Sequence, residues 1–479
     1  MRILLKTLLL VCCASSFLTP SLQGQFVLND TANTKQEEAF IIGNISLQGN
    51  STTKDRIILR EIVFHTGDSL DAAQLAEKLE QSRRNLLNKS IFNFVEWDTA
   101  GAVDNNRLIH VTFNFIERWY IWPMPIFELA DRNINAWWET KDFRKANYGI
   151  FLTYNNFRGR LEQLKVLIRA GYNQNYYLQY DIPYINKAQT IGIGFQLGYS
   201  LSREVPYLTI NNKQKFFRSE TDYARREWYA RVKMTYRRNI HNSHDLTFGL
   251  EKATFLDTLQ TLNPLFLPGD DPAMKMWHLN YIYKNDHRDS KPYPLNGHYA
   301  DVDIHQYGLG LMKNEAAFTT LKTTIDFYRP ISNRWFYAAN ITAKMSSAAQ
   351  QPYYIQRGFG FGNDFVRSFE LFVVDGKHFG LFKTNLKYAL VTPRKSDLRF
   401  FKSEKFRKIH YAAYLNLFVD GGYVAQDKQY AFNSFQNEWL TGFGLGLDLV
   451  TYYDLVWRFE CSVNHYNKPG FFLHFVAPI

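Results

Sequence analysis

Strict period-two alternation in the C-terminal two thirds of the chain is the feature that most limits its fold. Residues 191–201 carry apolar side chains at odd positions with Gly, Gln or Ser between them, and residues 441–449 repeat the pattern. Successive side chains point to opposite faces in a β-strand. The polar face often carries glycine or charge, which a water-filled barrel interior tolerates and a dry sandwich core does not. The pattern therefore predicts a β-barrel.

The barrel is expected to span residues 146–479 and to cross a membrane. At about ten residues per strand plus turns, this region holds about sixteen antiparallel strands. After the N-terminal leader the chain has no run of about 18 apolar residues that could cross a bilayer as a helix. Only a closed barrel could then span it. Aromatic residues make up 16% of the chain, which suits the aromatic girdles of such barrels.

The N-terminus is typical of an export signal. Arg2 and Lys6 precede an apolar core from Leu8 to about Phe17. We therefore predict a signal peptide over residues 1–24. Removing it leaves Cys461 as the only cysteine, so an intramolecular disulfide is excluded.

Residues 38–118 predict a small α/β domain. Expected elements are a strand over 40–50, a helix after Ser51–Asp55, a second helix starting at Gly67–Ser69, and strands over 92–97 and 108–115. Arg60 and Glu61 could be mistaken for a catalytic pair, and we interpret them as a solvated helix face. The order β-α-α-β-β resembles a POTRA domain, as do Gln48-Gly49-Asn50, Gly67-Asp68 and Ile91-Phe92. The resemblance implies that a sheet edge receives unfolded clients by β-augmentation.

Residues 119–145 are predicted to be a connector. The segment holds Pro123, Pro125 and four tryptophans. Its position just before the barrel favours aromatic seating at the membrane interface over a ligand-stacking site.

A short motif in the barrel region carries a family resemblance. Val366-Arg367-Ser368-Phe369-Glu370 follows a Gly-rich run over 357–362. It resembles the Val-Arg-Gly-Phe/Tyr-Asp/Glu loop of the BamA/TamA-type superfamily of outer-membrane assembly and translocation proteins. Ser368 stands where that family has glycine, which permits positive φ, so the loop tip is relaxed or the activity has diverged.

A second motif supplies the expected partner of the loop arginine. Phe418, Asp420 and Gly422 resemble the family's Phe-x-Asp-x-Gly strand, and alternation independently places Asp420 on the inner face. The resemblance implies that Arg367 pairs with Asp420, because a guanidinium grips a carboxylate with two hydrogen bonds. In a hydrated interior we expect about 1 kcal/mol from the pair.

The end of the chain resembles a barrel-insertion signal. Gly470, Leu473 and Phe475 fit the form Gly-x-x-apolar-x-aromatic. Residues 476–479 extend beyond the usual terminal aromatic.

No motif predicts an enzyme, a cofactor or a metal site. A G-x-S-x-G elbow, a G-x-G-x-x-G fingerprint and a P-loop are all lacking. The net charge of +11 is scattered and matches no nucleic-acid-binding module, so we expect no nucleic-acid partner.

The resemblance implies a non-enzymatic outer-membrane protein with a single periplasmic POTRA-like domain. Its expected activity is insertion or translocation of proteins, through client capture by the POTRA domain and lateral opening between the first and last strands. Expected partners are unfolded outer-membrane or exported proteins, outer-membrane lipid, and periplasmic or lipoprotein subunits. A dedicated two-partner-type secretion transporter and a passive channel or structural barrel remain alternatives, with a barrel hydrolase far behind.

Overall fold

The protein has a four-stranded sheet, a sixteen-stranded sheet and a separate two-stranded hairpin. The computed structural model describes residues 39–101, 107–129, 146–312, 315–348, 351–398, 400–426 and 433–475. No helix within these ranges is long and apolar enough to cross a membrane. The predicted signal peptide lies outside them.

The smaller sheet belongs to the N-terminal domain. Its elements are β1 (Phe40–Gln48), α2 (Asp55–Leu59), β2 (Ser69–Leu70), α3 (Ala72–Leu87), β3 (Phe92–Gly101) and β4 (Leu108–Glu117). The strand order is β2-β1-β4-β3, with β1 parallel to β4 and the other pairs antiparallel. The helices cover an apolar core that includes Ile42, Ile58, Leu79, Phe92 and Phe113.

The helices differ in detail from the expectation. Helix α2 has one turn and ends at Leu59, so the buried Ile62 lies beyond it. Helix α3 begins after Asp71, which forms a reciprocal capping box with Gln74. The expected start at residues 67–69 is displaced because Ser69 and Leu70 pair with β1 instead.

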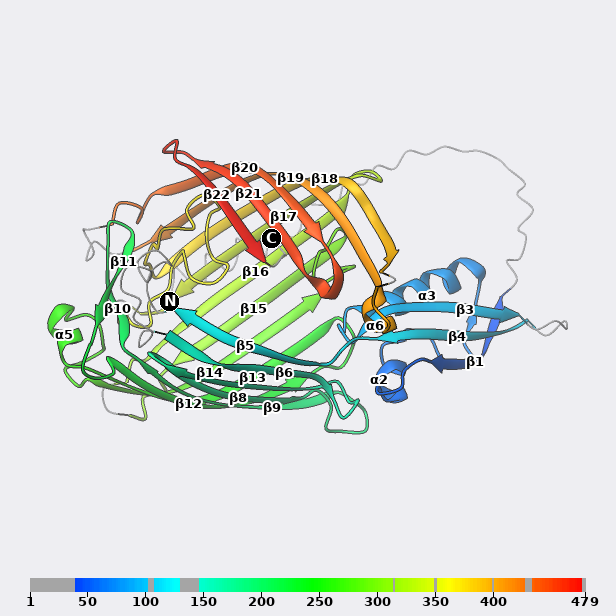
Figure 1. Cartoon of the computed structure of the whole chain (residues 1–479), viewed down its shortest axis with the longest axis horizontal. Coiled ribbons are helices and arrows are strands. Elements are labelled where there is room, and N and C mark those ends of the chain that lie inside the picture. The colour runs from blue at the N-terminus through cyan, green and yellow to red at the C-terminus, as the bar shows by residue number, and fades with distance from the viewer. Residues whose placement is uncertain are drawn as a thin grey trace, which may run out of the picture. The chain divides into compact units, whose positions relative to one another are not determined.

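The larger sheet has sixteen antiparallel strands, which confirms the predicted barrel architecture (Figure 1). They are β5 (Ile121–Leu129), β6 (Ala146–Phe157), β7 (Glu162–Gly171), β8 (Gln174–Ile182), β9 (Ile191–Ser202), β12 (Arg225–Tyr236), β13 (Asn242–Phe255), β14 (Ala273–Asp286), β15 (Gly297–Tyr307), β16 (Phe318–Pro330), β17 (Trp335–Ser346), β18 (His378–Asp397), β19 (Lys408–Ala425), β20 (Trp439–Val450), β21 (Val456–Asn464) and β22 (Pro469–Phe475). The other elements are the hairpin β10 (Glu204–Ile210) and β11 (Lys213–Arg218), the helices α5 (Thr258–Leu262) and α6 (Glu404–Arg407), and the 3-10 turn η2 (Tyr452–Asp454).

Alternation sets the two faces of the barrel wall. In β19, Leu417 and Val419 are exposed on the outer face, whereas Asn416, Phe418 and Asp420 are buried on the inner one. The outer side chains provide the apolar surface that lipid requires. The inner ones are free to be polar.

The first strand lies where we expected a connector. Residues 121–129 form β5, which pairs with β6 from Ile121↔Tyr154 to Leu129↔Ala146. Pro123 and Pro125 are compatible with a strand here because β5 is at the edge of the sheet, where a backbone donor can be missing. The part of the expected connector over residues 130–145 lies outside the described residues.

Candidate functional site

The long loop between β17 and β18 carries the predicted motif and packs against the inner wall. Two backbone hydrogen bonds join Phe359 and Val374, at 2.9 and 3.0 Å, and give the loop a fixed narrow neck. A Cβ on Gly358 would lie 2.0 Å from the Val374 carbonyl oxygen, so the neck requires glycine there. Val366 and Phe369 are buried with wall residues such as Leu381, Val424 and Leu440. The loop is therefore a packed part of the interior.

Arg367 and Asp420 lie in direct contact at the tip of this loop. The guanidinium donates from Nε to Oδ2 at 2.7 Å and from Nη2 to Oδ1 at 2.6 Å, and the Arg367 backbone N–H also donates to Oδ2 at 3.2 Å. Arg367 is 4% exposed and Asp420 is 1% exposed. The hydrated setting expected for the pair is therefore wrong. Because the pair is buried, removing one partner would leave an uncompensated charge, at a cost of about 3–5 kcal/mol.

Four further strand residues complete the arginine's surroundings. Nη1 donates to Asn385 Oδ1 at 2.8 Å and lies 3.3 Å from Glu460 Oε1, while Nη2 donates to the Thr384 carbonyl at 3.0 Å. The guanidinium carbon lies over the Phe418 ring, 3.8 Å from the ring centroid. Strands β18, β19 and β21 thus all hold one side chain of the loop.

Sequence reasoning missed Asn385 and Glu460. Both lie on inner-face positions of their strands, and the alternation of Phe459 and Cys461 would have placed Glu460 inside. Alternation does not give the register between strands, which sets Asn385 opposite Phe418 and puts Glu460 across β20 from Asn416.

Ser368 keeps the backbone shape that the family glycine would have. Its φ is +79°, so the loop tip is not relaxed. A non-glycine residue in this region costs about 1–3 kcal/mol, unless its surroundings compensate. Strand β20 approaches closely here, because a Cβ on Gly442 would lie 2.1 Å from the Arg367 carbonyl oxygen and 2.4 Å from Ser368 Oγ. Gly442 therefore leaves the space that the Arg367 carbonyl and the Ser368 side chain occupy.

Gly422 and Glu370 show what the other motif positions do. A Cβ on Gly422 would lie 2.6 Å from the Phe359 ring and 2.8 Å from Val366, so the glycine makes room for the loop. Glu370 reaches the last strand, where its Oε2 lies 3.1 Å from His474 Nε2.

The predicted C-terminal signal lies apart from this arginine cluster. Gly470, Leu473 and Phe475 belong to β22, and the side chains of Leu473 and Phe475 are exposed on the outer face. Within the described ranges, strand β22 pairs only with β21.

The first and last strands do not form a ladder. Among the described residues, no backbone pairing links β5 to β22, and the two strands are the edges of the sixteen-stranded sheet (Figure 1). We call this pair of edges the seam.

The backbone of β5 shows which of its groups face the seam. The Tyr120 carbonyl accepts a hydrogen bond from Asn155 N in β6 at 2.8 Å. Since neighbouring residues of a strand bond to opposite sides, Pro123 and Pro125 direct their nitrogens to the seam. Two donors are therefore missing from the free edge of β5.

Side chains bridge the two sides of the seam at the N-terminal-domain end. Arg118 donates to both carboxylate oxygens of Asp454, at 2.7 and 2.8 Å, and Trp119 N donates to Tyr453 Oη at 2.9 Å. Arg118 and Trp119 lie just before Tyr120 and β5, and η2 joins β20 to β21. We call these four residues the clasp.

A second contact fixes the N-terminal domain to the barrel. Glu61 is buried and lies 2.9 Å from Lys89 Nζ and 2.8 Å from Arg237 Nη1 in the β12–β13 turn. Burial raises the pKa of Glu61, but Lys89 and Arg237 outweigh this effect and lower it to about 2. The interpretation of Arg60 and Glu61 as a solvated face is therefore wrong, since Arg60 also donates to the Gln189 and Arg237 carbonyls.

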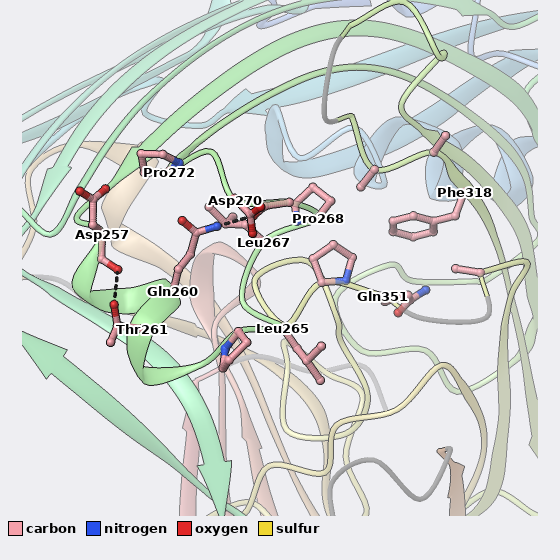
Figure 2. Close-up of a pocket in the computed structure, with 16 residues that line it drawn as sticks. Asp257, Gln260, Thr261, Leu265, Leu267, Pro268, Asp270, Pro272, Phe318 and Gln351 are labelled. Carbon is pink, nitrogen blue, oxygen red and sulfur yellow. Dashed lines mark hydrogen bonds between the residues drawn. The ribbon is translucent and has the colours of Figure 1, made fainter.

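A cavity of about 870 Å³ lies elsewhere, at the end of the barrel where the long loop begins (Figure 2). Its lining comes from the β13–β14 segment, including Gln260 and Pro268, and from Phe318 and Gln351. It contains none of the motif residues.

Comparisons with known proteins agree with these features. A family model described as an Omp85 superfamily domain matches residues 156–451. A POTRA model, described as a surface antigen variable number repeat, matches residues 40–118. No curated protein sequence matches the chain.

Three solved structures are similar at low identity. BamA from Haemophilus ducreyi lacking POTRA domains 1–3 has 14% identity and a TM-score of 0.48, over 91% of this chain and 83% of that one. CdiB from Escherichia coli has 12% identity and a TM-score of 0.48, over 94% and 92%. CdiB from Acinetobacter baumannii has 12% identity and a TM-score of 0.47, over 91% and 73%.

Proposed function

Since the chain belongs to the Omp85 superfamily, with one POTRA domain, we propose that it inserts proteins into an outer membrane or translocates them across it. The observation that carries this proposal is the unpaired seam. A closed barrel with a complete ladder has no edge, whereas an exposed edge offers backbone groups to another strand. The edges of β5 and β22 are such templates for an incoming strand.

The seam is weak because of its own sequence. Pro123 and Pro125 remove two donors from the β5 edge, so a full ladder with β22 cannot form even if the strands approach. Lateral opening therefore has fewer hydrogen bonds to break than opening at any other strand pair would.

The POTRA domain acts in this scheme by presenting the outer edge of β3 on the periplasmic side. In the part of the chain that the structure describes, strand β3 pairs with β4 only. Near its start this edge contacts the β18–β19 hairpin, through Asn93 to the Lys405 carbonyl and Glu96 to Lys395. The half beyond Glu96 is therefore the part that an extended client would add to.

A depletion experiment tests the activity. Loss of the protein should leave unfolded barrel proteins in the periplasm. Selective loss of small-solute uptake would instead indicate a passive channel, and loss of one large exported protein would indicate a dedicated transporter.

A crosslinking experiment tests the route of the client. A photoreactive residue at Thr99, on the β3 edge, should capture clients, and the same residue at Glu77 on α3 serves as the control. Equal capture at both positions would contradict edge addition.

A further inference from the structure

Three ligand-type side chains from three segments converge beside the seam. Glu370 comes from the loop motif, Glu460 from β21 and His474 from the last strand, β22. His474 Nε2 lies 3.1 Å from Glu370 Oε2 and 3.4 Å from Glu460 Oε2, and the three ligand atoms lie within 4.8 Å of one another. None of the three was predicted to bind a metal.

One imidazole N–H cannot bond to both of these carboxylates. The imidazole Nε2 carries at most one hydrogen, yet carboxylates from two residues face it. Charge-assisted N–H···O bonds are usually about 2.7–2.9 Å long, and both separations here exceed that. A tetrahedral cation with bonds of about 2.0–2.1 Å would hold its ligand atoms about 3.3–3.4 Å apart.

Two arginines fix how Glu460 faces His474. Glu460 Oε1 faces Arg367 at 3.3 Å and Arg458 at 3.9 Å, which leaves Oε2 directed to His474. Each arginine already has its own carboxylate, Asp420 for Arg367 and Asp448 for Arg458. Arg367 therefore orients Glu460 as an outer-shell partner would.

An unpartnered buried amide lies next to this group. Asn416 is 1% exposed, and neither its Oδ1 nor its Nδ2 has a hydrogen-bond partner among the described residues. A Cβ placed on Gly446 would lie 3.3 Å from Glu460 Cγ and 3.7 Å from Asn416 Cβ, so both side chains lie over the same glycine. Water bound to a cation at Glu460 would give the amide a partner.

We propose that His474 Nε2, Glu370 and Glu460 bind one divalent transition-metal ion, with water as a further ligand. An imidazole with two carboxylates suits Zn²⁺ and its neighbours more than Mg²⁺ or Ca²⁺, which prefer all-oxygen sites. The ion joins the motif loop to β22 and so fastens one side of the seam. Metal binding does not depend on the proposed function, whereas the effect of the metal on opening of the seam rests on that function.

Metal binding is tested on the purified full-length protein. We expect one equivalent of Zn²⁺ to bind, and Co²⁺ to give visible absorption bands at the same stoichiometry. His474→Ala and Glu370→Gln should each weaken binding at least tenfold. His244→Ala, which removes an imidazole from β13, should leave it unchanged. Heat-modifiable gel mobility shows that each variant is folded.

Two results would overturn the proposal. One is the absence of stoichiometric binding by the folded wild-type protein, and the other is binding that His474→Ala does not weaken. The pH dependence separates the remaining explanations, because a metal requires a deprotonated imidazole and binds more tightly from pH 6 to pH 8, whereas an ion pair requires a protonated one. Client insertion is measured separately, so a failure of the proposed function leaves this test intact.

Discussion

Arg118, at the end of the POTRA domain, forms an ion pair with Asp454 in the turn between β20 and β21. Two hydrogen bonds join the guanidinium to the carboxylate. The pair links both sides of a seam that has no ladder among the described residues. Its partners are partly sheltered, with side-chain exposures of 8% and 24%. The clasp is therefore positioned to control how often the seam opens.

Breaking the clasp should make the seam between β5 and β22 open more often. Asp454→Asn removes the negative charge that Arg118 binds. We expect this change to cost about 1–3 kcal/mol, a range that covers a lost hydrogen bond to a charged group and a buried polar group left without a partner. Spin labels at Phe127 in β5 and Phe471 in β22, both exposed on the outer face, should report a larger population of long distances.

The matched control for this change is Glu128→Gln, which removes the exposed pair between Glu128 in β5 and Arg169 in β7. It should not alter the distances. An identical response from both variants would show that the clasp has no special role.

The Arg367–Asp420 pair makes a different prediction. Arg367→Ala and Asp420→Ala should lower client insertion to a similar extent, and the double variant should be little worse, because either change alone destroys the same contact. Each should destabilise the folded loop by about 3–5 kcal/mol. Arg367→Lys should fail to restore activity, because lysine cannot reproduce the two-bond grip.

Arg357→Ala is the control for that series, since Arg357 is another arginine of the same loop and donates to the Gln356 carbonyl. Losses that add up in the double variant would contradict the pairing as the cause.

Ser368 offers a test in the opposite direction. Its φ of +79° suits glycine, so Ser368→Gly should raise the free energy of unfolding of the loop by about 1 kcal/mol. Ser368→Ala keeps the strained backbone and should give no such gain. Limited proteolysis of the loop measures both, and greater cleavage in Ser368→Gly would show that the serine side chain stabilises the tip.

Alternation revealed much of this fold because it is a local property. It predicted a barrel and put Asp420 on the inner face without reference to any family, while the length of the region gave the number of strands. The burial of Arg367 was not predictable in the same way. Burial depends on how the loop fills the interior, and therefore on contacts such as Gly442 to Ser368 that join distant segments.

Strand β5 was missed for a related reason. Pro123 and Pro125 indicate a break in regular structure when only local propensity is considered. They are acceptable here because the strand ends the sheet, and the position of a strand in a sheet is not written in its own residues. Glu61 was misjudged likewise, since its partner Arg237 lies in a turn 176 residues away.

The pKa of Glu61 predicts how acid affects the contact between the POTRA domain and the barrel. Its value falls from 4.5 to about 2 on folding, so its contribution is complete above pH 4.5 and is lost as the pH falls from 4.5 through 2. The shift corresponds to about 3 kcal/mol. Spin-label distances between Glu77 in α3 and Lys187 in the β8–β9 turn should broaden over this range, and Glu61→Gln should show the broadening already at pH 7.

Glu80→Gln provides the comparison, because it removes a carboxylate that pairs with Arg83 within α3. Its distances should match those of the wild type at pH 7. A wild-type distance that stays narrow at pH 2 would show that other contacts hold the domain without Glu61.

The seam prolines lead to the most direct test of the proposed mechanism. Pro123→Val with Pro125→Val restores two backbone donors that point to β22, and each new ladder hydrogen bond is worth about 1 kcal/mol. The seam should close more often, and client insertion should slow. Met124→Val is the control, because its backbone N–H points to β6 and adds no donor to the seam. The labels at Phe127 and Phe471 measure closure, and insertion of a reporter barrel measures activity. Faster insertion by a more tightly closed seam would refute lateral opening as the route of the client.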